Sequence, residues 1–287
     1  MKTKVLFVVL FHVCFLSATF IESFGKERLW KQLKDIQPAV NKHFVVVIAS
    51  YNNQNWYKKN LNSVFNQTYK NYHVIYIDDC SSDKTGALVE QYVKEQHQEL
   101  HVTLIKNKER RGAMANYYEA IHSCGAASII VQLDGDDWFA HDHVLDLLNR
   151  VYNDPNVWLT YGQFKRYPSG EKGYCQEIPS KIIETNEFRS YKWVTSALRT
   201  FYVGLFKLIK KEDLLFNGQF LPMTHDLAIM FPMLEMAGSR IKFIPDVLYI
   251  YNNATVLNDH KVNGALQKTL NHFIRAKEKY TPLAKAS

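Results

Sequence analysis

Short, continuous apolar runs alternate along this chain with stretches in which apolar residues recur every three or four positions. The runs are bounded by polar residues and are rich in valine and isoleucine, as buried β-strands are. Five of them predict strands, at residues 43–49, 72–77, 101–105, 129–133 and 157–161. The intervening stretches have helical spacing, as at Met114, Tyr117 and Ile121. Strands that alternate with helices in this way favour βαβ units and a mostly parallel sheet.

The alternation weakens in the second half of the chain. Residues 162–190 contain glycine, proline and charged residues, and they predict an irregular excursion. The remaining expectations are a helix from Asp226 to Met236 that Pro232 can kink, one or two short strands at 241–251 around Pro245, and a final helix at 261–280.

Polar residues follow four of the predicted strands. In chain order they are Ser50 and Tyr51, then Asp78 and Asp79, then Asn107 with Arg111 beyond it, and last Asp134 with Asp136 and Asp137. The carboxyl ends of parallel strands meet at one edge of a sheet, and open α/β folds bind their ligands at that edge. This convergence predicts a nucleotide site, with helix N-termini available for phosphate charge.

The segment Asp134-Gly135-Asp136-Asp137 carries three carboxylates within four positions. Clustered carboxylates repel one another and usually need a cation, and hard oxygen ligands suit Mn²⁺ or Mg²⁺ that is shared with substrate phosphates. A solvated acidic turn is the alternative. The position directly after a buried strand favours the metal site.

These motifs resemble those of the family 2 glycosyltransferases, which have a Rossmann-like GT-A fold. The resemblance rests on four segments in the family's order, at residues 47–52, 77–83, 107–116 and 133–137. It implies an α/β domain over residues 43–255, with a mostly parallel central sheet flanked by helices. Within it we expect a nucleotide-binding half at 43–160 and a smaller acceptor half at 161–255. A C-terminal helical segment, 256–287, would follow.

The resemblance also implies a role for each polar residue. Ser50 and Tyr51 would bind the donor beside its base, and Asp79, supported by Asp78, would accept a hydrogen bond from the base. Asn107 and Arg111 would flank the base and the phosphates. Asp134 would contact the ribose or the sugar. Asp136 would be the metal ligand, and Asp137 would orient the metal shell or the acceptor. Simpler readings stay open: Tyr51 in the core, Asp78 as a helix cap, and Arg111 as a solvated charge.

The catalytic base is expected in the second half of the chain. Family members usually carry a Glu-Asp pair there, and this chain has His225-Asp226 instead. Asp226 fits the base, whereas His225 is the alternative because its ordinary pKa suits neutral pH. Both residues could instead cap the helix that follows. By the same resemblance, Arg199 would stabilise the leaving diphosphate.

The implied activity is metal-dependent, inverting transfer of a sugar from a UDP- or GDP-linked donor to a hydroxyl of a carbohydrate or glycoconjugate acceptor. The chain lacks the Gln-x-x-Arg-Trp motif of processive synthases, so we expect non-processive transfer. Two other classes stay open. A sugar-phosphate nucleotidyltransferase would want a glycine-rich basic loop after the first strand, and a non-catalytic binding protein would not need Asp136 or Asp226.

The N-terminus has the layout of a targeting segment. Lys2 and Lys4 precede an apolar stretch from Val5 to Ile21, which favours a signal peptide over residues 1–25; a signal anchor is the alternative. Residues 26–42 would be a linker. Either reading predicts the lumen of the secretory pathway, secretion, or membrane association through the N-terminus. The net charge of +7 is diffuse and suits anionic partners such as nucleotides, and no motif indicates nucleic-acid binding.

Overall fold

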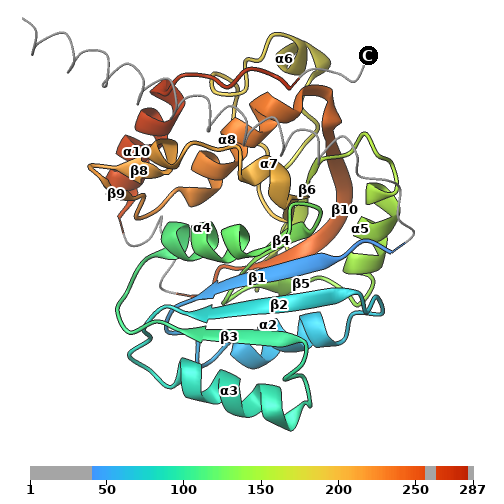
Figure 1. The fold of residues 1–287 in the computed structure, drawn as a ribbon, viewed down its shortest axis with the longest axis vertical. Coiled ribbons are helices and arrows are strands. Elements are labelled where there is room, and N and C mark those ends of the chain that lie inside the picture. The colour runs from blue at the N-terminus through green and yellow to red at the C-terminus, as the bar shows by residue number, and fades with distance from the viewer. Residues whose placement is uncertain (1–40, 256–262, 284–287) are drawn as a thin grey trace, which may run out of the picture.

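The computed structural model describes residues 41–255 and 263–283, which are built around one large sheet (Figure 1). The sheet has eight strands in the order β3-β2-β1-β4-β7-β6-β10-β5. Their bounds are β1 Phe44–Ser50, β2 Tyr72–Asp78, β3 Val102–Lys106, β4 Ile129–Asp134, β5 Trp138–Phe139, β6 Leu159–Tyr167, β7 Arg199–Tyr202 and β10 Ile241–Asn252. A separate hairpin pairs β8 Leu215–Phe216 with β9 Gln219–Phe220.

Most neighbouring strands of the large sheet are parallel. β3, β2, β1 and β4 run in one direction, and β10 runs parallel to β6. β7 is antiparallel to both β4 and β6, and β5 is antiparallel to β10. β1 is the central strand of the first half, and its continuous apolar sequence is buried on both faces, as expected for a covered parallel strand. The predicted α/β fold with a mostly parallel sheet is confirmed.

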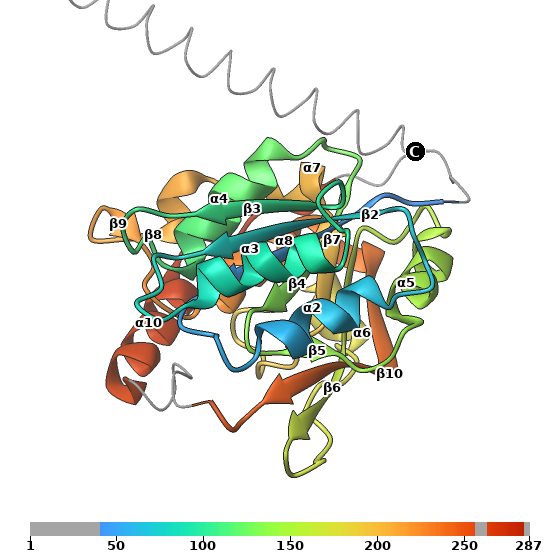
Figure 2. The same ribbon diagram turned by 90° about the horizontal axis from the view of Figure 1, so that it is seen from below.

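Helices cover both faces of this sheet. Figure 2 shows α2 and α3 on one face of the β1–β3 region and α4 on the other. The helices are α2 Tyr57–Phe65, α3 Thr85–Glu95, α4 Ala113–Ser123, α5 Val144–Tyr152, α6 Ser180–Glu184, α7 Val203–Phe206, α8 His225–Ala237 and α10 Gly264–Ala276, with short 3-10 turns at Lys211–Leu214 and Gly238–Arg240. In the described part of the chain, no helix is both long and apolar enough to cross a membrane.

The second half of the chain differs in detail from the predicted elements. β6 continues to Tyr167, so the irregular excursion begins later than residue 162, and β7 was not predicted. Residues 241–252 form one strand despite Pro245, because the pairing with β6 shifts register between Ile244 and Val247. The final helix occupies 264–276. The predicted signal segment, and the linker except for residues 41–42, lie outside the described residues.

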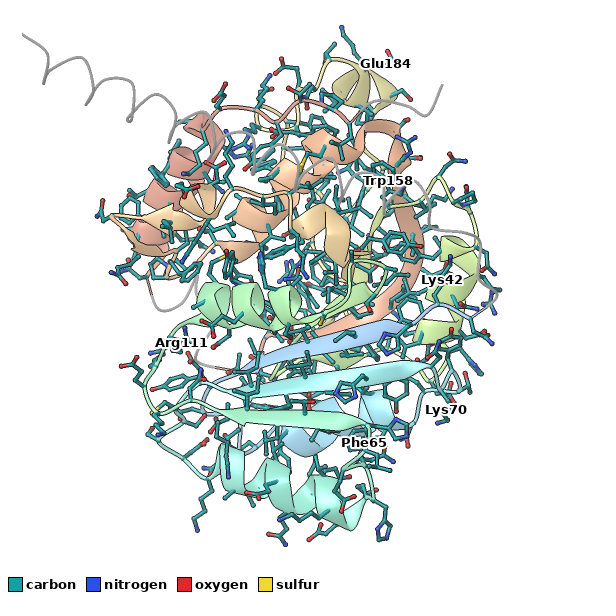
Figure 3. The ribbon with its side chains drawn as sticks, viewed as in Figure 1. Lys42, Phe65, Lys70, Arg111, Trp158 and Glu184 are labelled. Atoms are coloured by element: carbon teal, nitrogen blue, oxygen red, sulfur yellow. The ribbon has the colours of Figure 1, made fainter. Side chains whose placement is uncertain are left out.

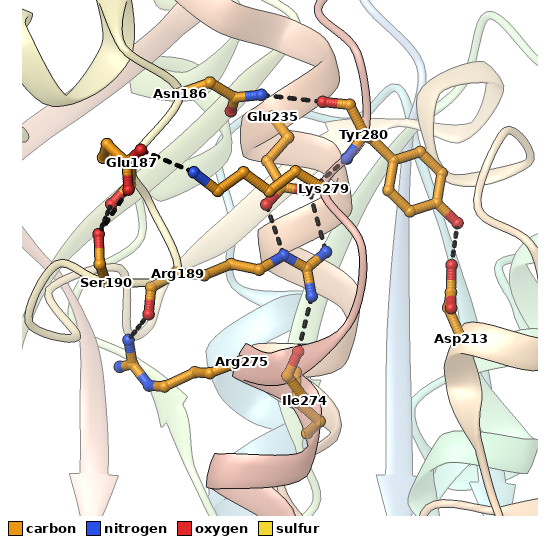
Figure 4. Close-up of polar contacts among 10 residues, drawn as sticks. All are labelled: Asn186, Glu187, Arg189, Ser190, Asp213, Glu235, Ile274, Arg275, Lys279 and Tyr280. Carbon is orange, nitrogen blue, oxygen red and sulfur yellow. Dashed lines mark hydrogen bonds and ion pairs between the residues drawn. The ribbon is translucent and has the colours of Figure 1, made fainter.

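A buried ion pair joins the acceptor half to the C-terminal segment (Figure 4). The guanidinium of Arg189 donates to Glu235 on α8 at 2.5 and 2.9 Å, and to the carbonyl of Ile274 on α10 at 2.6 Å. The same carboxylate accepts a hydrogen bond from the backbone N–H of Tyr280 at 2.9 Å. Glu235 is fully buried and Arg189 nearly so. Helix α8 is therefore fixed from two sides, and its N-terminal turn carries His225 and Asp226.

Candidate active site

The carboxyl ends of β1, β2 and β4 lie level at one edge of the sheet. The strand register pairs Ser50 with Asp78 and places Asp134 beside Ala49. Figure 3 labels Arg111 at this edge, after β3, and Lys70 at the opposite edge, before β2. The predicted convergence of polar residues is thus present in the fold.

Asp79 organises the loop between β3 and α4. Its carboxylate accepts hydrogen bonds from the backbone N–H groups of Arg111 and Gly112, at 2.9 and 2.8 Å, and from the Asn107 amide at 2.8 Å. Burial acts to raise the pKa of Asp79, but these hydrogen bonds and one from Asn116 lower it overall. Asp79 therefore stays ionised and holds Asn107 and Arg111 close together. Its contact with a base stays a prediction.

The Arg111 side chain turns away from Asp79. Its guanidinium forms a two-pronged ion pair with Glu119 on α4. The neighbouring Arg110 lies over the Tyr51 ring, 3.9 Å from its centroid, a contact that the sequence analysis did not anticipate. Tyr51 is thus a partly exposed ring at the strand end rather than a core residue. Arg110 and Tyr51 together place a cation and an aromatic ring at the strand ends.

Ser50 and Asp78 lie behind this surface. The Ser50 hydroxyl accepts hydrogen bonds from Asn53 at 3.0 Å and from Tyr76 at 2.8 Å, and Asp78 accepts one from Ser81. Burial raises the pKa of Asp78. A Cβ atom at Gly135 would lie 2.6 Å from the Ser50 side chain, so the acidic turn after β4 can pass β1 this closely only with glycine there.

The acidic turn is held by side chains from α2, α4 and β10. The hydroxyl of Tyr117 donates to Asp134 at 3.0 Å, and that of Tyr249 donates to Asp137 at 2.5 Å. The Asn60 amide donates to the carbonyls of Asp134 and Asp137, at 2.9 and 2.7 Å. Burial, followed by the charges of the neighbouring aspartates, raises the pKa of Asp137 well above its usual range.

Arg199 connects the strand β4 with the helix α8. It lies on β7, donates to Gln132 on β4 at 3.1 Å, and places its Nη1 atom 3.8 Å from a carboxylate oxygen of Asp226. Burial alone would lower the pKa of Arg199, but the negative charges of Asp226 and then Asp134 raise it. The arginine is therefore held between the carboxylate at the end of β4 and the carboxylate on α8.

The start of α8 presents His225 and Asp226 to the same region. The N-cap residue is Thr224, so neither of the two caps the helix. The His225 ring lies 5.3 Å from that of Tyr117, which is itself bonded to Asp134. The Nε2 atom of His225 is buried without a hydrogen-bond partner. Buried polar atoms seldom lack a partner, and this one lies beside the acidic turn.

The sequence of this chain matches a known protein family. Residues 45–214, more than half of the chain, match the family described as Glycosyl transferase family 2. The chain belongs to this family.

Curated relatives are named glycosyltransferases, and solved structures share the fold of this chain. Streptococcus pneumoniae serotype 4 glycosyltransferases GlyA and GlyG are 23% and 27% identical to this family 2 chain, over 60% and 72% of its length. The chain spans 26% of GlyA and 69% of GlyG. S. aureus TarS 1–349 in complex with UDP-GlcNAc has a TM-score of 0.57 at 19% identity, covering 74% of this chain and 58% of TarS. The Pyrobaculum calidifontis mannosyltransferase PcManGT, in complex with GDP-Man and Mn²⁺, has a TM-score of 0.54 at 18% identity, covering 92% and 76%. These likenesses confirm the GT-A fold.

The acidic turn of this family 2 chain has oxygen donors of the kind that suit a divalent cation shared with phosphates. Among the described residues, no cluster of three histidine, cysteine or acidic side chains could hold a metal by itself. Tyrosine hydroxyls donate to Asp134 and Asp137, and Asp136 lies half-buried in the same turn. Mg²⁺ and similar ions are commonly bound by one or two carboxylates, with water and phosphate completing the shell. Asp136 is the residue that would hold such an ion.

Several residues of the site were missed by the sequence analysis. They are Asn60, Tyr117, Gln132, Tyr249 and Asn252, of which Asn252 donates its backbone N–H to Asp137 at 2.6 Å. Tyr117 has the helical spacing of a core residue and is indeed fully buried. Only its hydroxyl reaches the site, and spacing does not reveal that. Asn60 could have been identified from the sequence, because an amide on the buried face of α2 must find polar partners.

Proposed function

We propose that this protein transfers a single sugar from a UDP- or GDP-linked donor to a hydroxyl of a carbohydrate or glycoconjugate acceptor, with inversion and with a divalent metal ion. The observation that carries the proposal is the position of Arg199, between Asp134 at the nucleotide edge and Asp226 on α8. In the proposed reaction the nucleotide leaves from one side of the anomeric carbon, and a hydroxyl attacks from the other side. The carboxylate at the nucleotide edge and the carboxylate that would act as base must therefore lie close to the same carbon.

The nucleotide would lie along the ends of β1 to β4. Tyr51 and Arg110 offer a ring face and a cation, and the Asp79-bound loop offers Asn107 beside them. The complexes of TarS with UDP-GlcNAc and of PcManGT with GDP-Man support a nucleotide-sugar donor. Asp134 would meet the ribose or sugar.

The diphosphate would lie against Asp136. A divalent cation bound there would act as a Lewis acid and stabilise the charge that develops on the leaving phosphate. The Mn²⁺ in the PcManGT complex supports this choice of cofactor. The buried guanidinium of Arg199 adds a fixed positive charge in the same region, where low solvent exposure strengthens its effect.

Asp226 would act as the general base. It is about a quarter exposed, so an acceptor hydroxyl can reach it, and its carboxylate lies 3.8 Å from the Arg199 guanidinium. The carboxylate takes the proton as the hydroxyl oxygen attacks the anomeric carbon. A single displacement from the face opposite the leaving diphosphate inverts the configuration.

A donor screen on the full chain tests the proposal. Each common UDP- and GDP-sugar is supplied with Mn²⁺ and then with EDTA, and release of UDP or GDP is measured. Release from one donor that stops with EDTA is the expected result. Release that EDTA leaves unchanged would remove the metal from the proposal. An absence of release, with and without a panel of acceptor sugars, would overturn the transferase function.

A further inference from the structure

An exposed aromatic ring lies beside the proposed base. Tyr174 is 47% exposed, whereas most large apolar and aromatic side chains of the described residues are buried. Its hydroxyl lies next to Ser196, which precedes Arg199 by three residues, and the Nη1 atom of Arg199 lies 3.8 Å from Asp226. Tyr174 therefore lies in the region of the Arg199–Asp226 pair, and nearly half of its surface is open to solvent.

The segment that carries Tyr174 is fixed to β6 on both sides of the ring. The N–H of Gly173 donates to the carbonyl of Phe164 at 2.7 Å, and the Gln163 amide donates to the carbonyl of Cys175 at 2.8 Å. A Cβ atom at Gly173 would lie 2.4 Å from the Phe164 ring, so only glycine lets the segment approach this closely. The ring is thus pre-organised, and ordering it costs little on binding.

Three rings run from the base toward the acidic turn. Tyr174 packs edge-on against Phe164 with centroids 5.5 Å apart, and Phe164 lies 5.9 Å from Tyr251. Burial, followed by the charges of Asp137, Asp134 and Asp136, raises the pKa of Tyr251. Tyr251 also directly precedes Asn252, whose backbone N–H donates to Asp137 at 2.6 Å. The row therefore leads from Tyr174 to the acidic turn that would hold the diphosphate.

We propose that Tyr174, backed by Phe164 and Tyr251, forms the acceptor subsite and takes the pyranose ring of a carbohydrate. This inference rests on the proposed function. A pyranose has an apolar C–H face that suits an exposed aromatic ring, and its hydroxyls suit polar groups at the rim such as Ser196 and Arg166. Arg166 lies over the Phe164 ring, 5.5 Å from its centroid.

A lipid chain fits this surface less well. Lipid binding needs a contiguous apolar patch. Among the described residues, the exposed large hydrophobic side chains are Leu100, Ile105, Tyr167 and Tyr174. Leu100 and Ile105 belong to the β3 edge, and both tyrosines carry a polar tip. A single open ring with polar neighbours is the pattern expected for a sugar.

The test measures glycan binding and turnover separately. The full-length wild type, Tyr174→Phe, Tyr174→Ala and Tyr167→Ala are applied with UDP or GDP and Mn²⁺ to a printed array of mono- to tetrasaccharides. The strongest hit is then titrated by calorimetry and used as acceptor. Tyr167 is the matched control, because it is a second exposed tyrosine, at the end of β6, and it packs on Trp138 rather than on Phe164. Melting temperatures verify folding.

The expected result is a Kd and an acceptor KM about tenfold higher in Tyr174→Ala, with Tyr174→Phe and Tyr167→Ala close to wild type. Equal binding by Tyr174→Ala, or an equal loss in Tyr167→Ala, would overturn the subsite. So would a wild type that releases nucleotide from its donor but binds no arrayed glycan. A protein that binds glycan through Tyr174 but never turns over a donor would retain the subsite and refute the transferase.

Discussion

The hydrogen bond of the Tyr249 hydroxyl distinguishes Asp137 from Asp134 in the acidic turn. This hydroxyl lies 2.5 Å from Asp137 and 3.3 Å from Asp134, and it has one proton to donate, so the shorter contact is its hydrogen bond. Asp137 also accepts from the backbone N–H of Asn252 at 2.6 Å and is almost fully buried. Asp137 therefore shapes the turn, and Asp136 is the proposed metal ligand.

This division predicts different losses for two similar substitutions. Asp136→Asn should reduce metal-dependent nucleotide release by at least about 100-fold, because a neutral amide binds a divalent cation poorly. Asp137→Asn should mainly lower the free energy of unfolding. Release rates over a Mn²⁺ titration and urea unfolding curves measure the two effects, with the exposed Asp142→Asn as control. A metal response in Asp136→Asn equal to that of wild type would contradict the assignment.

Asp226 is predicted to be needed for the chemical step alone. Asp226→Asn keeps the size of the side chain and removes its basicity, so transfer to an acceptor should fall by about 100- to 10,000-fold. The Kd for UDP or GDP, measured by calorimetry, should stay within a few-fold of wild type. His225→Gln is the matched comparison. If that variant loses transfer while Asp226→Asn retains it, the base is His225.

At the scale of elements, α8 is positioned by contacts far from its catalytic turn. Glu235 lies near the other end of the helix and is bonded to Arg189, while Arg275 donates to the carbonyl of Arg189 and, at 2.9 Å, to that of Tyr191. Because α10 and the segment before β7 meet at this one ion pair, the C-terminal segment contributes to holding the helix that carries Asp226.

Breaking this ion pair on one side should destabilise the protein strongly. Arg189→Met leaves the Glu235 carboxylate buried without its partner, and the expected loss is about 3–5 kcal/mol of unfolding free energy. The double variant Arg189→Met with Glu235→Met should recover part of it, since no charge then stays buried. Urea unfolding of the two single variants and the double variant measures the coupling. A double variant with a loss equal to the sum of the single losses would show that the two residues act independently.

The nucleotide half was predictable from sequence because its strands are continuous apolar runs, as in β1 and β4. β7 was missed because it is short and carries Arg199 and Thr200, which are buried polar residues in an antiparallel insertion. The strand-end aspartates were found from their positions. The partners that assign their roles, such as Tyr249, come from a strand more than 100 residues away, and only tertiary structure brings them together.

At the scale of the whole molecule, the sheet separates two chemically different edges. The carboxyl ends of the strands gather aspartates and the proposed site. At the opposite edge, His43 precedes β1, His73 lies at the start of β2 and His101 precedes β3. Burial lowers the pKa of His43, and burial followed by the charges of His43 and His101 lowers that of His73. Folding therefore favours the neutral forms of His43 and His73.

Global stability should consequently fall as the pH drops below about 6.5, the ordinary pKa of histidine. A lowered pKa means that the unfolded chain binds protons more readily than the folded chain. The stability contributed by these histidines is therefore complete above the pKa of the unfolded state and is lost as the pH falls through the pKa of the folded state.

His73→Gln removes this group but can still hydrogen-bond to Thr103, which lies 2.8 Å from His73. Melting temperatures should thus fall less steeply between pH 7 and pH 5 in this variant than in wild type, and the exposed His272→Gln should behave like wild type. Because His73 lies at the edge away from Asp136 and Asp226, nucleotide release at pH 7.5 should be the same in all three proteins. An unchanged pH slope in His73→Gln would show that the histidine edge does not contribute to acid sensitivity.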